Sequence, residues 1–488
     1  MPIDAADIKK KVQAGEDPSA VKQEYMSKGM LEADIEKAMK AAGARSAAKK
    51  PTAGANENAK ALAAKDIFDT FGYAFSSQQF LNIFFYQSGA GLFLIGMFNA
   101  FRNLLTVLAS AVVQSYNKNI TYYKKSVTVL GIFLSISMLL LACATGRGAT
   151  WMFAVVFLLT GILVAGHGDF YIKVRELGEG EGNRAGEMTA DVMGNTGIMV
   201  KVQRYGLVMT AFALIVAGYA LDKVAYLPVM GWRLHSSFLL MSMAALSFFL
   251  GLLMFMLYRP DNRTKNLRNA QNDSLFASAQ VTLGKTFLSL GNFMKDRTSL
   301  ILIIATMLVS TAQMWGSIFY GLFIFNNLGE AGFGPYLNVA VIFTIAALTS
   351  LLGPIISRLN AAEYGTFPML AFGTMLMAIM PFVYFFNPNI GSIAMATTLG
   401  IIGAAIAGVA QGMLVHDLIP AIQHNEFYSS IAIISSLPFV ITGPLGGYIA
   451  DRFGMSMLFL VSGIILIAVV GLYFLLVLDN HNKHHHKK

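Results

Sequence analysis

Twelve long apolar runs set the strongest limit on how this chain of 488 residues can fold. A helix needs about 20 apolar residues to cross the hydrocarbon core of a bilayer. The chain is 55% hydrophobic and 13% charged, and the charged fraction is about half of that in soluble domains. We therefore predict an all-α membrane protein with twelve transmembrane helices. The spans are expected at residues 67–87, 92–114, 126–145, 150–168, 188–221, 234–258, 299–326, 336–357, 366–386, 390–415, 427–450 and 455–478.

The whole sequence divides into six predicted parts. Helix caps at Asp4 and Asp17-Pro18, with stops at Gly15 and Gly29, predict a small cytoplasmic three-helix unit over residues 1–42, and the alternative is a solvated cytoplasmic extension with some helix. The other parts are a flexible linker (43–66), a six-helix half (67–258), a cytoplasmic central loop with an amphipathic helix (259–298), a second six-helix half (299–478) and a basic, His-rich tail (479–488).

The distribution of Lys and Arg predicts the orientation in the membrane. With the N-terminus inside, 29 of the 36 basic residues fall on the inner side and four (Arg147, Lys223, Arg233 and Arg452) on the outer side. Cytoplasmic loops of membrane proteins carry this excess of positive charge. We therefore expect a multi-pass protein of the cell membrane with both termini in the cytoplasm.

Composition and motifs exclude several classes of function. The net charge of +9 follows from the positive loops, so we expect no nucleic-acid partner. The single cysteine, Cys143, permits neither an intrachain disulfide nor a cysteine zinc site. The sequence has no P-loop, GxSxG elbow or HExxH helix, so we expect no enzyme, no metal site and no bound cofactor. A proton or another ion could still couple to the function.

Short repeats relate the two halves. Gly218-Tyr219-Ala220-Leu221-Asp222 ends the fifth run, and Gly447-Tyr448-Ile449-Ala450-Asp451 ends the eleventh. Together with the segments Gly231-Trp232-Arg233, Arg184-Ala185-Gly186 and Gly443 to Gly454, this pattern resembles the major facilitator superfamily over about residues 67–478. The loop after the second run, Tyr116 to Asn119, lacks the acidic residue of that family. The resemblance implies two six-helix halves around a central cavity lined by spans 1, 4, 7 and 10, with alternating access.

Three cations inside the spans are the strongest candidates for a binding site. Arg102, Lys201 and Arg204 fall within apolar runs at similar depth, where each charge costs about 2.5 to 3.5 kcal/mol. No Asp or Glu lies at that depth, so a bound anion would be their partner. The alternative is that they snorkel, or pair with carbonyl and tyrosine oxygens.

Two stripes of polar residues lie on spans that are equivalent in the repeat. Each follows one helical face, as a substrate-facing helix requires. The alternative is interhelical hydrogen bonding that holds the bundle together. The stripes are Gln79, Asn82 and Tyr86 in the first span and Gln313, Ser317 and Tyr320 in the seventh.

Histidine–aspartate pairs at the inner ends of spans 4 and 10 are candidate gate residues. They are His167 with Asp169 and His416 with Asp417. Ion pairs with neighbouring basic residues could break and re-form during alternating access, while solvation of helix ends is the alternative.

The leading hypothesis is a secondary transporter for an organic or phosphorylated anion. One alternative is a drug or metabolite exporter, although central cations would repel cationic cargo. The other is a transporter-like receptor or assembly factor that binds a protein partner through residues 1–42.

Overall fold

A computed structural model describes residues 53–115, 120–145, 148–178, 197–224, 226–229, 232–259, 297–330, 332–356, 365–418 and 436–485. The chain divides into two compact units, Met1–Lys60 and Ala61–Lys488, and the second contains the helical bundle. The expected three-helix unit (1–42), most of the central loop and the last three residues of the tail lie outside the described residues.

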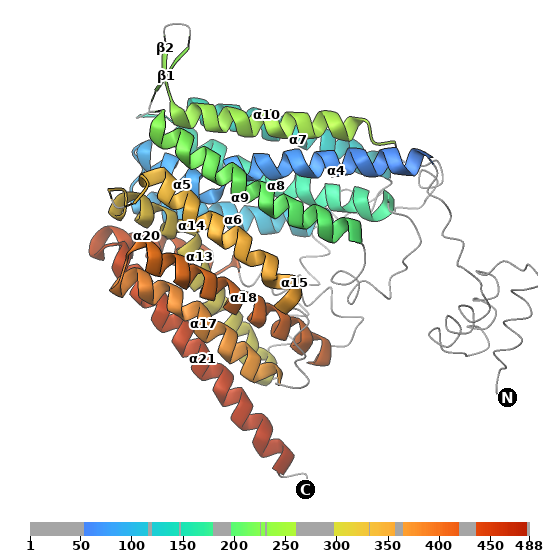
Figure 1. The fold of residues 1–488 in the computed structure, drawn as a ribbon. Helices are drawn as coiled ribbons and strands as arrows, with labels where there is room; N and C mark the ends of the chain where they lie inside the picture. Colours follow the sequence, from blue (N-terminus) through green and yellow to red (C-terminus); the bar gives the residue numbers. More distant parts are fainter. Residues whose placement is uncertain are drawn as a thin grey trace, which may run out of the picture. The chain divides into compact units, whose positions relative to one another are not determined.

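The first half of the bundle contains seven of the described helices, and a short hairpin interrupts it (Figure 1). The first span consists of two helices, and each later span consists of one. These helices are α4 (Ala53–Phe75), α5 (Gln78–Gln87), α6 (Leu92–Ser115), α7 (Ile120–Cys143), α8 (Thr150–Gly178), α9 (Gly197–Lys223) and α10 (Ser236–Met256).

The second half repeats this plan with the yellow-to-red helices of Figure 1. A 3-10 turn and a short helix extend the second of its spans. The elements are α13 (Arg297–Asn327), α14 (Pro335–Thr349), η1 (Ser350–Leu352), α15 (Gly353–Ile356), α17 (Thr366–Phe386), α18 (Ile390–Leu418), α20 (Phe439–Phe453) and α21 (Met455–His485).

Ten of the described helices are long and apolar enough to cross a membrane. The broken first span and α20 supply the other two expected positions, so the prediction of an all-α membrane protein is confirmed. The helix α4 begins at Ala53, so residues 53–66 are helical where we expected a flexible linker. Six of its fourteen residues are Ala, the strongest helix former.

A two-stranded hairpin adds the only described strands and marks one end of the bundle. Strands β1 (Tyr226–Val229) and β2 (Trp232–His235) pair antiparallel between α9 and α10, with Leu227 opposite Leu234. Helices α5, α9, α13 and α20 end on this side, and α6 and α14 begin here, because helix directions alternate along the chain. We call this side the hairpin end, and the other side the opposite end.

Glycines set the close packing of helices within and between the halves. In the second half, a Cβ on Gly403 of α18 would lie 2.5 Å from the carbonyl oxygen of Gly373 on α17. Between the halves, a Cβ on Gly96 of α6 would lie 2.4 Å from the carbonyl oxygen of Gly443 on α20. Small residues let helix backbones approach closely where lipid provides no hydrophobic drive for association.

We predict that Gly403→Ala destabilises the protein, whereas Gly408→Ala on the same helix does not. A methyl group at Gly403 meets the backbone of α17, whereas a Cβ at Gly408 has no atom within 4 Å. Overpacking costs about 1–3 kcal/mol, while Ala for Gly favours a helix by about 1 kcal/mol. Thermal unfolding in detergent tests this, and equal unfolding temperatures for the two variants would contradict the packing described here.

Candidate functional site

The first span breaks at Ser76 and Ser77, between α4 and α5. The α4 helix ends there with Ser76 Oγ donating a 2.7 Å hydrogen bond to the carbonyl oxygen of Gly72. Ser77 adopts an extended backbone conformation (φ −57°, ψ 145°) and forms the N-cap of α5. Two serines, with hydroxyls that compete for backbone hydrogen bonds, favour such a break.

The N-terminus of α5 lacks a side-chain cap. The first backbone N–H groups of a helix have no partner within it, and an N-cap oxygen usually accepts one of them. Ser77 makes no such bond, and among the described residues its buried Oγ has no hydrogen-bond partner. The break therefore presents amide donors and a free hydroxyl at the positive end of a helix dipole.

A cavity of about 380 Å³ adjoins this break. Hydroxyl and amide groups supply most of the polar part of its wall, and none of its lining residues is charged. It lies between the break, α9 of the same half and α14 of the other half. Its lining residues are Thr70, Tyr73, Ala74, Ser77, Gln79, Thr210, Leu214, Phe343 and Ala347.

Two predicted polar residues of the first span join the halves. Gln79 Nε2 donates to the carbonyl oxygen of Ser317 on α13 at 2.8 Å, and Gln79 Oε1 accepts from the amide of Gly321 at 3.0 Å. Asn82, which is fully buried, donates to the carbonyl oxygen of Ile318 at 3.1 Å. These bonds match the interhelical alternative, although Gln79 also lines the cavity.

A chain of amide side chains connects the break to α6. Gln78 Nε2 donates to Asn99 Oδ1 at 2.8 Å, and Asn99 Nδ2 donates to Asn82 Oδ1 at 2.9 Å. Asn99 is fully buried. Arg102 follows Asn99 by three residues, so its Cα lies one helical turn further along α6, about 4.5 Å by the helical rise.

Arg102 has a buried guanidinium nitrogen, Nε, that makes no hydrogen bond to any part of the chain that the structure describes. Its Cζ lies 4.7 Å from the centre of the Phe157 ring on α8. A Cβ on Gly161 would lie 2.7 Å from Arg102 Cγ, so this glycine makes room for the side chain. The described ion pairs do not include Arg102.

The other members of the two stripes differ in their surroundings. Tyr86 and Gln313 are exposed, and Ser317 Oγ bonds the carbonyl oxygen of Met314 in its own helix. Tyr320 packs against Tyr384 and Phe459, with ring centres at 4.3 and 4.9 Å. Tyr320 thus contributes to aromatic packing inside the second half.

The remaining predicted residues are placed only along their helices. Lys201 and Arg204 lie on α9, and His416 and Asp417 lie on α18. Their side chains lie outside the described part of the structure. Gly206 is close to Thr70, since a Cβ added to Gly206 would lie 3.5 Å from Thr70 Oγ1. Arg204 and Lys201 precede Gly206 by two and five residues, or about 3 and 7.5 Å along α9.

Comparisons with known proteins identify the architecture. No family model matches the sequence, and no curated protein matches it. The nucleoside transporter NupG aligns with a TM-score of 0.66 at 11% identity, covering 86% of this chain and 98% of that one. A POT family transporter aligns at 0.60 with 14% identity, covering 87% and 96%. The human organic anion transporter MFSD10 aligns at 0.52 with 11% identity, covering 86% and 99%. The chain has the major facilitator fold.

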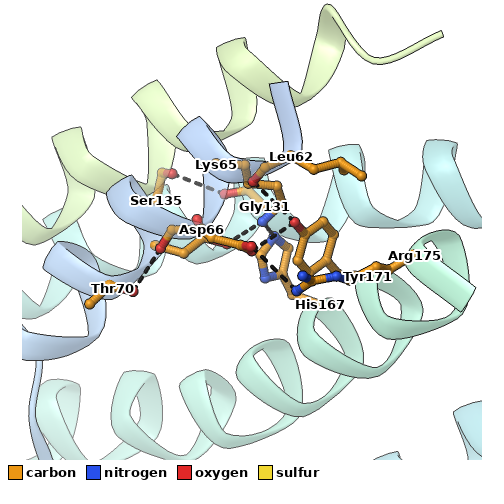
Figure 2. Close-up of polar contacts among 10 residues, drawn as sticks. Leu62, Lys65, Asp66, Thr70, Gly131, Ser135, His167, Tyr171 and Arg175 are labelled. Carbon is orange, nitrogen blue, oxygen red and sulfur yellow. Dashed lines mark hydrogen bonds and ion pairs between the residues drawn. The ribbon is translucent and has the colours of Figure 1, made fainter. Parts of the chain in front are cut away.

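A second polar cluster of this major facilitator fold was not predicted from the sequence. Lys65 on α4 pairs with Asp69, and its Nζ lies 3.3 Å from His167 Nε2 on α8 (Figure 2). Lys65 is fully buried, and Asp69 and His167 are 7% and 3% exposed. Lys65 was expected among the solvated basic residues of the linker. The structure instead buries it between α4 and α8.

Two further contacts at the edge of this cluster join α4 to α8. Asp66 accepts a 2.7 Å hydrogen bond from Tyr171 Oη and forms a 3.3 Å ion pair with Arg175, as Figure 2 shows. A glycine on a neighbouring helix leaves the space for Asp69, because a Cβ on Gly251 of α10 would lie 2.7 Å from Asp69 Oδ1.

The two predicted gate residues of span 4 have different neighbours. His167 faces Lys65, while Asp169 bonds Ser110 and interacts with Lys173. Each keeps one buried polar atom without a partner, His167 Nδ1 and Asp169 Oδ2. The spacing of Lys65 and Asp69, four residues apart at the start of the first apolar run, was the available signal for the cluster.

We predict that Lys65→Met destabilises the protein more than the double change Lys65→Met/Asp69→Leu does. The single change leaves the Asp69 carboxylate buried without its partner, which costs about 3–5 kcal/mol. The double change removes both charges and the need to solvate them. Thermal unfolding in detergent measures both, with exposed Lys223→Met as the control. A double variant at least as unstable as Lys65→Met would contradict this account.

Proposed function

We propose that this chain is a secondary transporter that works by alternating access and carries an organic or phosphorylated anion. The observation that carries the proposal is the uncapped N-terminus of α5, where Ser77 and Gln79 line the cavity between the halves. Transporters use the N-termini of interrupted helices to bind anionic groups of their substrates.

The cations of the first half supply the charge that such a cargo requires. Arg102 lies one turn from the Asn99 network that bonds the break, and its Nε has no hydrogen-bond partner in the described ranges. A guanidinium can hold a carboxylate or phosphate with two parallel hydrogen bonds. Lys201 and Arg204 lie on α9, on the opposite-end side of Gly206 and Thr70. We propose that these three residues attract and bind the anionic group.

The uncharged part of the substrate meets the wall of the cavity, which is mainly apolar. Thr70, Tyr73, Ser77, Gln79 and Thr210 offer hydroxyl and amide groups, and Leu214 and Phe343 offer apolar surface. This combination suits a small organic molecule that has apolar surface, a few polar groups and an anionic group. The solved neighbours carry nucleosides, peptides and organic anions by their descriptions, so the fold accommodates such a cargo.

Alternating access requires the hydrogen bonds between the halves to change during the cycle. The bonds of Gln79 and Asn82 to α13 lie beside the cavity, in the part of the bundle nearer the hairpin end. We propose that they release when the cavity opens toward that end. His167, Asp169, His416 and Asp417 remain candidate gate residues at the opposite end, with a proton or another ion as the coupling species.

Neutralising the three cations tests the anionic substrate. We expect Arg102→Gln/Lys201→Gln/Arg204→Gln to lose the thermal stabilisation that anionic metabolites give the parent protein, because ligand binding raises apparent stability. Uptake of the stabilising anion into proteoliposomes should fall by at least tenfold, about 1.4 kcal/mol. Arg452→Gln, an exposed change at the hairpin end, is the control. Unchanged anion binding in the triple variant would disprove the proposal.

A change at the helix break tests the role of the α5 N-terminus directly. Ser77→Asp places a carboxylate where an N-cap accepts from the free amides, so the folded protein should be as stable as the parent or more stable. The same charge occupies the proposed anion site, so anion affinity should fall by at least tenfold. Ser77→Asn caps the helix without charge and is the matched control. If both variants bind anions equally well, the anion binds elsewhere.

A further inference from the structure

The repeated Gly-Tyr-x-x-Asp segments at the ends of α9 and α20 make equivalent contacts with the other half. Asp222 ends α9, and its carboxylate accepts hydrogen bonds from the amides of Tyr336 at 3.1 Å and Leu337 at 2.7 Å. These amides belong to the first turn of α14. The carboxylate thus caps a helix of the opposite half.

The second segment makes the same kind of contact with α6. Asp451 accepts hydrogen bonds from the amides of Leu92 at 3.2 Å and Phe93 at 2.8 Å. These are the first two residues of α6. The two contacts are related by the internal repeat, since each half supplies one carboxylate and one helix N-terminus.

Neither capped helix has a side-chain cap of its own. Gly334 is the N-cap of α14, and Gly91 precedes α6, so the local sequence offers no oxygen to the first amides. Gly334 has φ +132°, and a Cβ there would lie 2.4 Å from Asp222 Oδ2. A side chain at Gly334 would therefore collide with Asp222, and the glycine allows this aspartate of the other half to cap α14.

The glycine of each segment brings the backbones together one turn before the aspartate. A Cβ on Gly218 would lie 2.5 Å from Ala340 Cβ on α14. A Cβ on Gly447 would lie 2.6 Å from both the carbonyl oxygen of Leu92 and the Cα of Phe93 on α6. Glycine and aspartate four residues apart lie on one helical face, so they form one contact.

We infer that Asp222 and Asp451 are the gate residues that hold the hairpin end closed. Each contact joins the halves at this end and consists of charge-assisted hydrogen bonds to a helix N-terminus, which form or break as a unit. Opening the hairpin end separates α9 from α14 and α20 from α6, and leaves both helices uncapped. The two aspartates thus bias the protein toward the state in which the hairpin end is closed.

The two contacts differ in strength. Asp222 is half-buried, whereas Asp451 is exposed. Water and salt screen an exposed charge more than a half-buried one. The Asp222 contact is therefore the stronger of the pair, and its loss should open the hairpin end further than the loss of the Asp451 contact.

Distances between spin labels on the two halves test this inference. Cysteines replace the exposed residues Trp151 of α8 and Asn387 after α17 at the hairpin end, in a Cys143→Ser background. A second pair at Tyr122 and Ile355 reports on the opposite end. In Asp222→Ala/Asp451→Ala the hairpin-end distances should lengthen and the opposite-end distances shorten, with about a tenfold change in the ratio of closed to open molecules.

Single and conservative variants keep the test decisive if the double alanine variant fails to fold. Asp222→Asn and Asp451→Asn preserve shape and one acceptor but remove the charge, and Asp222→Asn should produce the larger shift. Asp66→Asn, a carboxylate that bonds only within the first half among the described residues, is the control and should leave the hairpin-end distances unchanged. Distances that stay unchanged in both folded Asn variants would overturn the inference.

The inference rests on the proposed transport function, because a gate has meaning only in an alternating-access cycle. Its measurement uses no substrate, however, so the two proposals can fail separately. If the labels show the expected shift while the triple cation variant still binds anions, the gate stands and the anion site does not. If the cation variant loses anion binding and the labels do not move, only the gate is wrong.

Discussion

Hydrocarbon offers the backbone no hydrogen-bonding partner, and the architecture of this protein follows from that constraint. Helices satisfy their amides internally, so the described spans are helical almost throughout. The exceptions are informative. The break at Ser76 and Ser77 leaves the first amides of α5 without a side-chain cap, and it does so beside a cavity rather than against lipid. The same rule explains why α6 and α14 receive their caps from another part of the chain.

Run length and composition were sufficient to predict the fold. Each described span overlaps a predicted apolar run, because a helix that crosses a bilayer must be long and hydrophobic enough to do so. The repeat between Gly218–Asp222 and Gly447–Asp451 by itself indicates two related halves. The break in the first span could not be predicted in the same way. Polar serines inside an apolar run lower its hydropathy only slightly, and the break depends on the hydrogen bonds of Ser76 and on packing across the halves.

The candidate site was predicted in part. Gln79 lines the cavity, and Arg102 carries a buried nitrogen that has no hydrogen-bond partner among the described residues. Tyr320 belongs to an aromatic cluster instead, because helical spacing identifies a face but not the helix that the face meets. The buried pair of Lys65 and Asp69 was missed for a related reason. A charge at the start of an apolar run has the same sequence signature whether it is solvated or enclosed, and the structure encloses this pair beside Gly251 of α10.

The two helices of the broken first span contact different parts of the bundle. Its α4 part is attached to α8 of its own half through the Lys65–His167 contact and the Asp66–Arg175 ion pair. Its α5 part bonds α13 of the other half through Gln79 and Asn82, and it also bonds Asn99 on α6 of its own half. A continuous helix would have to bend, or lose some of its backbone hydrogen bonds, whenever the halves rotated against each other. The helix is already interrupted at Ser76 and Ser77, so bending of the first span during that rotation would concentrate in the segment that also borders the cavity.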